Sequence, residues 1–503
     1  MSDAESGVTV DPQITAVAVV GSGVAGWSAA AALKRRISSL NVEVISSPPA
    51  PDSIVDRVIS TLPSIVDFHA DIGLTDADTI VRAQSALRAG TIFEGWADGL
   101  ADYVHAYGNY GVPIDGTPFH QQWLRARAVA KVQPFDRFSP AAELGRSGRF
   151  AAQGTAIVGA MPTIGYGLQL TMERYQQLMR AYALHLGVAE RGGEIAAVPL
   201  RPSDGFIDRL ELTDGTRVTA ELYVDCTGPQ ANIRSKLGGE FIDWSGWLPC
   251  DRLIFATAQP RQDAQLLDGV SSTAFGWQWA ASSPAVSCHG AAYCSAHARR
   301  DEAIAGLPQA CRSAAAEISI RQGRWAQPWV RNCVAVGDAA VTVEPLEWAN
   351  LHLVHSQIDR LVSMMCGRDC AEVELGEYNR QSNAEADRIR DFVCAHYVTA
   401  RRDEPFWAEA SRIEPPESLA HTLLLFAERG RLPYYEEETF SRDSWLALLL
   451  GQGFTPRRTD PLADIVPIED VTRSIANYRE AIKSFVDSQP VYHQVFSSLG
   501  QHA

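Results

Sequence analysis

The sequence predicts an α/β fold that joins a mixed sheet to a mostly helical C-terminal lobe. Ala16–Val20 is a short apolar run, the pattern of a strand buried on both faces. A glycine-rich turn and an alanine-rich helical stretch follow it directly. After about residue 375 the strand pattern disappears, and aromatic and charged residues recur at helical spacing. We therefore expect a sheet-containing module over residues 1–375 and a helical lobe over residues 376–503.

The first element is a strand–turn–helix unit with three spaced glycines. Its turn reads Gly21-Ser22-Gly23-Val24-Ala25-Gly26, the G-x-G-x-x-G spacing. Gly21 allows the tight turn, Gly23 lets backbone approach a pyrophosphate, and Gly26 lets helix and strand pack closely. The helix N-terminus offers free N–H groups to phosphates. The unit predicts a Rossmann-like, nucleotide-binding module, and a glycine turn that only packs is the alternative.

Two further strands contribute candidate contacts to the same cofactor. Asn41–Ile45 reads as the second strand, and Ser46 stands where an acidic ribose contact is expected. Asn332 to Val336 is a buried strand that runs into Gly337 and Asp338. An aspartate there can accept a flavin ribityl hydroxyl, or it can cap a helix. We expect Ala16–Val20 and Val334–Val336 to be close neighbours that end at one crevice.

Other patterns give individual elements between these strands. Residues 166–187 show the spacing of one long amphipathic helix. Alternating runs at 206–212 and 217–224 flank Asp214-Gly215, which predicts a hairpin. His69 falls on the apolar face of a helical stretch and is expected to be a packed histidine.

Composition and charge exclude several classes of protein. The 503 residues carry a net charge of -16, which disfavours nucleic acid or an anionic membrane as a partner. No apolar run approaches transmembrane length, and residues 1–7 lack the features of a signal peptide. The nine scattered cysteines form no C-x-x-C, so we expect no metal site, free thiols and a cytoplasmic location.

Several stretches, in order along the chain, resemble one family, the flavin-dependent tryptophan halogenases. The most specific is the pair of tryptophans in Gly276-Trp277-Gln278-Trp279. The others are residues 21–27, 119–125, 224–228, 249–252, 329–346, 391–397, 403–407 and 444–453. The resemblance covers nearly the full length of the chain.

The resemblance implies a cofactor, partners and a reaction. Reduced FAD would come from a separate flavin reductase, and halide would be oxidised to hypohalous acid. That acid would pass the two tryptophans to a lysine beside a small, electron-rich aromatic substrate such as indole, where a glutamate assists. The tryptophans would keep substrate away from the flavin. We allow for a homodimer.

Compared position by position with the family's motifs, the chain offers candidate site residues and also differs from the motifs at several positions. Arg88 stands at the position of the family's catalytic lysine, and a guanidinium lacks the amine lone pair needed for a haloamine. Glu347 matches the first residue of the halide loop, which continues as Trp348, Ala349 and Asn350. The family's Gly-Glu-Ala-Thr segment matches residues 58–61, without its acid. Trp277 and Trp279 remain as tunnel residues, or as core aromatics.

Three functions stay open at this point. The first is a halogenase in which Arg88 replaces lysine. The second is a flavin monooxygenase or oxidase that uses no halide, and the third is a catalytically inactive paralogue that binds flavin or a partner. Because a buried guanidinium needs a carboxylate, we expect Arg88 to pair with Glu347 near the two tryptophans.

Overall fold

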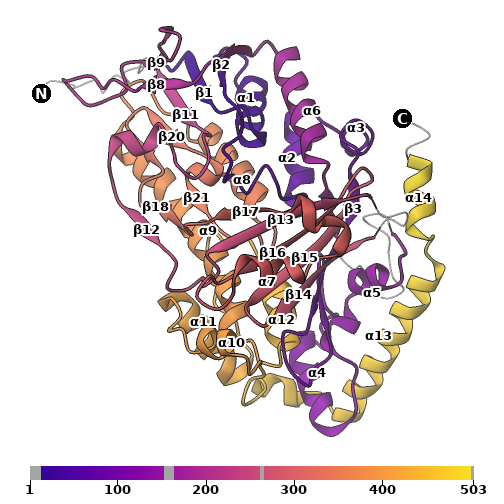
Figure 1. Cartoon of the computed structure of the whole chain (residues 1–503). Helices are drawn as coiled ribbons and strands as arrows, with labels where there is room; N and C mark the ends of the chain where they lie inside the picture. The colour runs from indigo at the N-terminus through magenta and orange to yellow at the C-terminus, as the bar shows by residue number, and fades with distance from the viewer. Residues whose placement is uncertain (1–12, 152–163, 261–264, 500–503) are drawn as a thin grey trace, which may run out of the picture.

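The structure is a computed structural model that describes residues 13–151, 164–260 and 265–499. Its elements form three regions, which Figure 1 shows from top to bottom. They are a six-stranded sheet with helices packed on it, a seven-stranded central sheet, and a helical region. Among the described residues, no helix is long and apolar enough to cross a bilayer. The same residues hold no cluster of metal-ligating side chains.

The first sheet has six strands in the order β19-β20-β11-β1-β2-β7. Its strands are β1 (Ala16–Val20), β2 (Asn41–Ser46), β7 (Ala189–Gly192), β11 (Leu222–Asp225), β19 (Trp329–Val330) and β20 (Cys333–Ala335). All neighbours pair parallel except β19 and β20, so the sheet is mixed, as predicted. Only β11 separates β1 from β20, and the predicted neighbourhood of these two strands is confirmed.

Helices cover one face of this sheet, where their apolar sides are buried against Val17 and Val19 of β1. The opposite face, which carries Ala18 and Val20, packs against residues 207–218. Next to the sheet lie α1 (Val24–Arg36), α2 (Ser64–Ile72), α3 (Asp76–Arg82), α6 (Met172–His185) and α8 (Asn350–Ser363). His69 of α2 is fully buried and bonds the Tyr175 hydroxyl through Nε2 at 2.8 Å, so its predicted packing role is confirmed.

Two predicted elements differ from the observed ones. The helix expected over 166–187 begins only at Met172, because Gly167–Gln169 forms β6 and pairs with β3 (Ala86–Arg88). In the predicted hairpin, β9 (Leu210–Leu212) does pair with β10 (Arg217–Val218) across Asp214-Gly215. The rest of its second arm is β11, which leaves the hairpin for the six-stranded sheet.

The central sheet has seven strands in the order β17-β13-β16-β15-β14-β4-β5. They are β4 (Gly90–Glu94), β5 (Tyr103–Ala106), β13 (Arg252–Ala258), β14 (Leu267–Thr273), β15 (Gly276–Ser282), β16 (Ser287–Tyr293) and β17 (Ala316–Ser319). The parallel pairing of β4 with β14 places Thr91 opposite Asp268. Two small sheets complete the strands: β8 (Ile195–Ala197) with β9 and β10, and β12 (Phe241–Asp243) with β18 (Gly323–Trp325) and β21 (Val341–Thr342).

Helices dominate after Glu372. They are α9 (Glu372–Val398), α10 (Pro405–Ala410), α11 (Glu417–Arg429), α12 (Arg442–Gly451), α13 (Ile468–Ser488) and α14 (Tyr492–Leu499). α13 packs against α4 (Phe119–Val129) and α5 (Pro140–Arg146), so an earlier segment shares this helical region. One further short helix, α7 (Arg300–Ala305), lies against β16. The division at residue 375 stays a prediction.

Candidate active site

The turn after β1 can be built only from glycine at two of its positions. Gly21 has φ +108°, and a Cβ there would lie 2.4 Å from the carbonyl oxygen of Cys226. A Cβ on Gly26 would lie 1.9 Å from the carbonyl oxygen of Gly21. The N-terminus of α1 has no side-chain cap from Gly23. The turn therefore leaves backbone N–H groups of α1 facing the end of the strand, where an anion is stabilised.

Asp338 lies on the same crevice as this turn. The crevice is lined by Gly21, Gly23, Ser47, Thr227 and Asp338, with neighbouring residues of the same loops. Asp338 follows β20, and burial raises the pKa of its carboxyl to about 6. Gly23 and Asp338 thus meet at one crevice, as the sequence predicts. Ser46 does not line it, whereas the next residue, Ser47, does.

A second side chain, Asp56, reaches the crevice from the loop after β2. Its Oδ1 accepts a hydrogen bond of 2.7 Å from the Val24 N–H, the first residue of α1. Sequence reasoning missed Asp56, because its position depends on a loop conformation that no spacing specifies.

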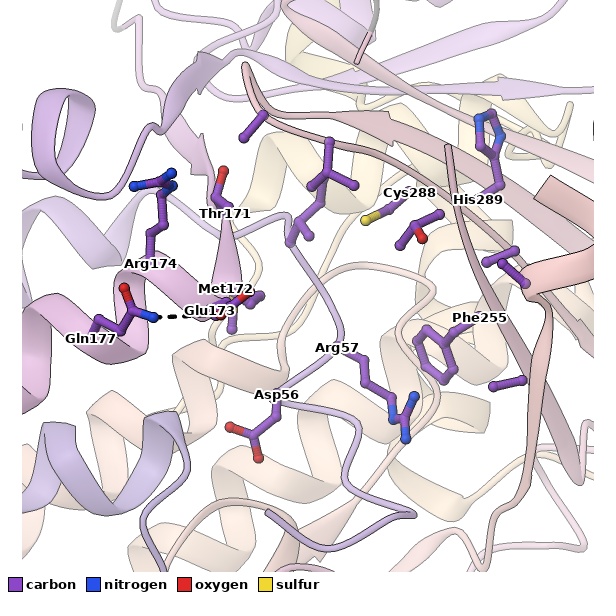
Figure 2. Close-up of a pocket in the computed structure, with 17 residues that line it drawn as sticks. Asp56, Arg57, Thr171, Met172, Glu173, Arg174, Gln177, Phe255, Cys288 and His289 are labelled. Atoms are coloured by element: carbon purple, nitrogen blue, oxygen red, sulfur yellow. Dashed lines mark hydrogen bonds between the residues drawn. The ribbon is translucent and has the colours of Figure 1, made fainter. Parts of the chain in front are cut away.

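Beside the crevice lies a cavity of about 600 Å³, drawn in Figure 2. Asp56 and Ile59 line it from the loop after β2, and Phe255 and Cys288 line it from the central sheet. The start of α6 and the residue before it contribute Thr171, Met172, Glu173, Arg174 and Gln177. Figure 2 shows the side chains of Asp56 and Arg57 diverging, with Arg57 directed toward Phe255. The Arg57 guanidinium carbon lies 5.6 Å from the centre of the Phe255 ring.

Arg88 is fully buried at the end of β3, and each of its guanidinium nitrogens has a partner. Nε lies 2.7 Å from Oδ2 of Asp268. Nη1 donates to the Tyr107 hydroxyl and, at 2.6 Å, to the Thr61 carbonyl, and Nη2 donates to Thr91 Oγ1 at 2.8 Å and to the Gly90 carbonyl at 3.2 Å. Burial lowers the pKa of Arg88, but the charges of Asp268 and Glu347 and the contact with Tyr107 together outweigh burial and raise the pKa above the usual value. Arg88 is therefore a paired, charged part of the core.

The predicted pairing of Arg88 with Glu347 is wrong. The carboxylate partner is Asp268, because the register of β4 and β14 brings Asp268 to the strand that follows Arg88. Gln169 Nε2 donates to the other oxygen of Asp268 at 2.6 Å. The prediction of a buried, inward-pointing Arg88 is confirmed.

Glu347 is held instead by two histidines. Its Oε2 lies 2.9 Å from His105 Nδ1, and its Oε1 lies 2.7 Å from His396 Nε2. Burial alone would raise the pKa of Glu347, but the charges and hydrogen bonds of the two histidines lower it to about 2. The carboxylate is therefore ionised at neutral pH.

A second buried acid nearby has the opposite protonation. Burial raises the pKa of Glu344 to about 8, although its Oε2 accepts from the Tyr397 hydroxyl at 2.9 Å. Two acids three residues apart thus differ because only Glu347 has histidine partners. The sequence pattern contains no signal for this difference.

The predicted tryptophans form a buried series with Trp348. Trp277 and Trp279 are 5.2 Å apart between ring centres, and Trp279 lies 6.5 Å from Trp348. The Trp348 indole N–H donates to Thr91 Oγ1 at 3.0 Å, and the Arg88 guanidinium carbon lies 5.7 Å from its ring centre. Trp348 also has φ +62°, a left-handed conformation that a bulky residue rarely adopts. The structure thus brings Arg88 and the three tryptophans together.

A separate open cavity of about 440 Å³ shares none of its lining residues with the cavity of about 600 Å³. Leu62, His105, Tyr107 and Phe440 are among its lining residues. His105 Nε2 has no hydrogen-bond partner among the described residues, while its Nδ1 is bonded to Glu347. Trp277, Trp279 and Trp348 do not line this cavity. Of its lining residues, His105 contacts the ionised Glu347.

Comparison with known proteins decides the family. The model of the tryptophan halogenase family matches residues 16–468. The chain belongs to the tryptophan halogenase family. Among curated relatives, tryptophan 6-halogenase ThaL of Streptomyces albogriseolus is 24% identical, over 97% of this chain and 99% of its own.

Solved structures of flavin-dependent halogenases share the fold. BrvH from Brevundimonas sp. BAL3 is 32% identical with a TM-score of 0.91, covering 97% of this chain and 100% of its own. Xcc4156 from Xanthomonas campestris is 28% identical with a TM-score of 0.91, covering 97% and 98%. The family implies a flavin, and the chemistry of the crevice suits one: the α1 N-terminus beside Gly23 offers backbone N–H groups to a pyrophosphate, and Asp338 offers a carboxylate to a hydroxyl.

The family's halide loop corresponds to Glu347, Trp348, Ala349 and Asn350. These residues lead into α8, whose first residue is Asn350. Asn350 Nδ2 donates to the Val343 carbonyl at 2.9 Å, so the side chain closes the loop on itself. Halide binding by this loop, a tunnel role of Trp277 and Trp279, and a ribose contact of Ser46 stay predictions.

Proposed function

We propose that this chain is a flavin-dependent oxidoreductase of the halogenase type that acts on a small, electron-rich, indole-like aromatic. FAD would lie in the crevice between Gly23 and Asp338, and the substrate in the cavity beside His105. A separate reductase would supply reduced FAD, because the sequence holds a single dinucleotide fingerprint, at Gly21–Gly26. When bound, reduced FAD supplies the electrons that turn O₂ into an oxidant.

The single observation that supports this proposal most is the Glu347–His105 pair. Glu347 is ionised and lies 2.9 Å from His105 Nδ1, which favours a proton on Nδ1 and leaves Nε2 as the nitrogen that can accept one. Nε2 is buried and has no hydrogen-bond partner among the described residues, and its side chain is one of those that line the cavity. A ring proton released when an electrophile replaces hydrogen on the substrate would go to Nε2. Glu347 would then stabilise the imidazolium.

The cavity suits an aromatic ring. Leu62, Pro63, Tyr107 and Phe440 give it apolar and aromatic walls, and its volume of about 440 Å³ exceeds that of an indole. Phe440 stacks on Phe392 at 3.9 Å between ring centres, which fixes that wall. Pairing of Asp268 with Arg88 keeps the charge of that guanidinium away from the cavity.

Arg88 favours a second candidate function, oxygenation or oxidation without halide. Its partners occupy every guanidinium nitrogen, and it has no lone pair to carry a halogen. The two candidates share the cofactor, the cavity and Glu347, and they differ in the atom added to the ring.

The test supplies chemically reduced FAD, O₂, bromide and a panel of indoles, and reads product masses. A bromine added to the ring supports the first candidate, and an oxygen added, with or without bromide, supports the second. Glu347→Gln should lower the yield by about 100-fold or more. Glu409→Gln is the matched control, since Glu409 also holds a histidine, His297 at 3.0 Å, but at the surface. No product from a folded protein that binds FAD would refute both candidates.

A further inference from the structure

The N-terminus of α1 already holds a negative charge from the chain itself. Oδ1 of Asp56 accepts the Val24 N–H at 2.7 Å. A Cβ placed on Gly23 would lie 2.7 Å from both carboxylate oxygens of Asp56. The carboxylate therefore fills the space over Gly23, where the fingerprint leaves room for a phosphate.

The same loop also donates hydrogen bonds to the carboxylate of Asp338. Oδ2 of Asp338 accepts from the Ile54 N–H at 2.7 Å, the Val55 N–H at 3.1 Å and the Ser53 hydroxyl at 3.1 Å. The Ser53 hydroxyl also lies 2.7 Å from Oδ2 of Asp56, which joins the two contacts. Residues 53–56 thus satisfy both groups that a flavin dinucleotide is expected to use.

Little space remains beside these contacts. The crevice has a volume of about 10 Å³, which is about one water molecule, whereas the neighbouring cavity has about 600 Å³. Asp56 lines both spaces, and Figure 2 shows it among the lining residues of the larger one. Displacement of residues 53–56 would join the crevice to the larger cavity.

We propose that residues 53–56 are a built-in competitor of the flavin dinucleotide. Asp56 takes the position of a phosphate, and the donors of Ser53, Ile54 and Val55 take the positions of ribityl hydroxyls. Flavin binding then requires release of the segment, and the observed affinity is lowered by the fraction of molecules in which the segment is bound. The proposal rests on the proposed flavin binding.

The chain offers a matched pair of variants for the test. Asp56→Asn keeps the size of the side chain but removes the charge that holds the α1 N-terminus. Asp52→Asn removes the same charge from the same loop, where Asp52 accepts from Gln230 at 3.0 Å and does not line the crevice. Since a charged hydrogen bond is about twice as strong as a neutral one, Asp56→Asn should tighten oxidised FAD and ADP on the order of tenfold. Asp52→Asn should change neither affinity by more than about twofold.

Fluorescence titration with FAD and with ADP measures these affinities, and ADP tests the phosphate position without the isoalloxazine ring. Hydrogen exchange gives an independent readout. FAD should increase, not decrease, exchange at the Ile54 and Val55 amides in the native protein, because they lose Asp338. Ser53→Ala should also tighten FAD, since it removes the hydroxyl that lies between the carboxylates of Asp56 and Asp338 and can donate to either.

Three outcomes are distinguishable. Tighter binding in Asp56→Asn but not in Asp52→Asn, with faster exchange at residues 54 and 55 on FAD addition, supports the competitor. Equal FAD affinity in the native protein and both aspartate variants overturns it and leaves flavin binding intact. Absence of FAD and ADP binding in all the folded variants overturns both the competitor and the proposed cofactor.

Discussion

At the scale of single residues, charge pairing decides which buried groups are ionised. Arg88 is charged beside Asp268, and Glu347 is charged between two histidines. Glu344, three residues from Glu347, has only neutral hydrogen-bond partners, and burial raises its pKa to about 8. Each group should therefore respond differently to mutation and to pH.

Removing the partner of Arg88 should cost stability. Asp268→Asn leaves a fully buried guanidinium without its counter-charge, which costs about 3–5 kcal/mol in unfolding free energy. Asp470→Asn is the control, since Asp470 pairs with Arg473 at 2.9 Å on the surface and should cost less than about 1 kcal/mol. Urea denaturation at pH 7 measures both. Similar small losses in the two variants would mean that the Arg88–Asp268 pair does not stabilise the core.

Glu344 should make stability fall as the pH rises. Its folded pKa of about 8 lies above its ordinary value of 4.5, so the folded state binds the proton more tightly than the unfolded chain does. The contribution is complete below pH 4.5 and is lost as the pH rises toward 8, by a few kcal/mol. The difference in unfolding free energy between the native protein and Glu344→Gln should shift in this window. A constant difference from pH 5 to pH 8 would contradict the prediction.

At the scale of elements, backbone geometry fixes the crevice more firmly than side chains do. The turn between β1 and α1 depends on Gly21 and Gly26, because a Cβ at either position would meet a backbone oxygen within 2.4 Å. β20 reaches the same edge through β11, and it carries Asp338 to the turn. These contacts link residues more than 300 positions apart.

Gly26→Ala should disrupt this turn. Its Cβ would lie 1.9 Å from the Gly21 carbonyl oxygen, so β1 and α1 must separate, at a cost of about 2–4 kcal/mol. Gly376→Ala provides the opposite control: Gly376 lies within α9 with open space at its Cβ, and alanine there should stabilise by about 0.5–1 kcal/mol. Thermal unfolding measures both changes. A Gly26→Ala variant as stable as the native protein would refute this account of the turn.

The sequence predicts the parts of the fold that follow from local patterns. The strand–glycine–helix unit, the mixed sheet, the meeting of Gly23 with Asp338 and the burial of Arg88 were all predictable from runs of residues or from the family resemblance. The partner of Arg88 was not, because Asp268 reaches it only through the register of β4 and β14. Asp56 and His105 were missed for the same reason: long-range contacts, which carry no local pattern, determine their roles.

At the scale of the whole molecule, two spaces lie on opposite sides of one chain segment. Ile59 lines the 600 Å³ cavity, and Leu62 lines the 440 Å³ cavity. Two residues, Ser60 and Thr61, stand between them, and the three residue steps of extended chain span roughly 10 Å. Arg88 bonds the carbonyl of Thr61 within this segment and so fixes the wall between the two spaces. This arrangement suits a reaction in which cofactor and substrate do not touch.

The molecule should depend on a second protein for reduced flavin. The sequence offers one dinucleotide fingerprint, at Gly21–Gly26, and none for a nicotinamide cofactor. With FAD present, the purified protein should therefore not oxidise NADPH faster than FAD in buffer does. Absorbance at the NADPH band measures this directly. Rapid oxidation without a reductase would mean that the chain binds nicotinamide itself.

The central claim is that an aromatic substrate binds beside His105 and Glu347, apart from the flavin crevice. The most direct measurement is the anomalous scattering of bromine in crystals soaked with 5-bromoindole and FAD. The account predicts a bromine peak in the 440 Å³ cavity lined by His105, Tyr107 and Phe440, with FAD phosphates at the N-terminus of α1. A bromine peak elsewhere, with this cavity free of it, would contradict the account.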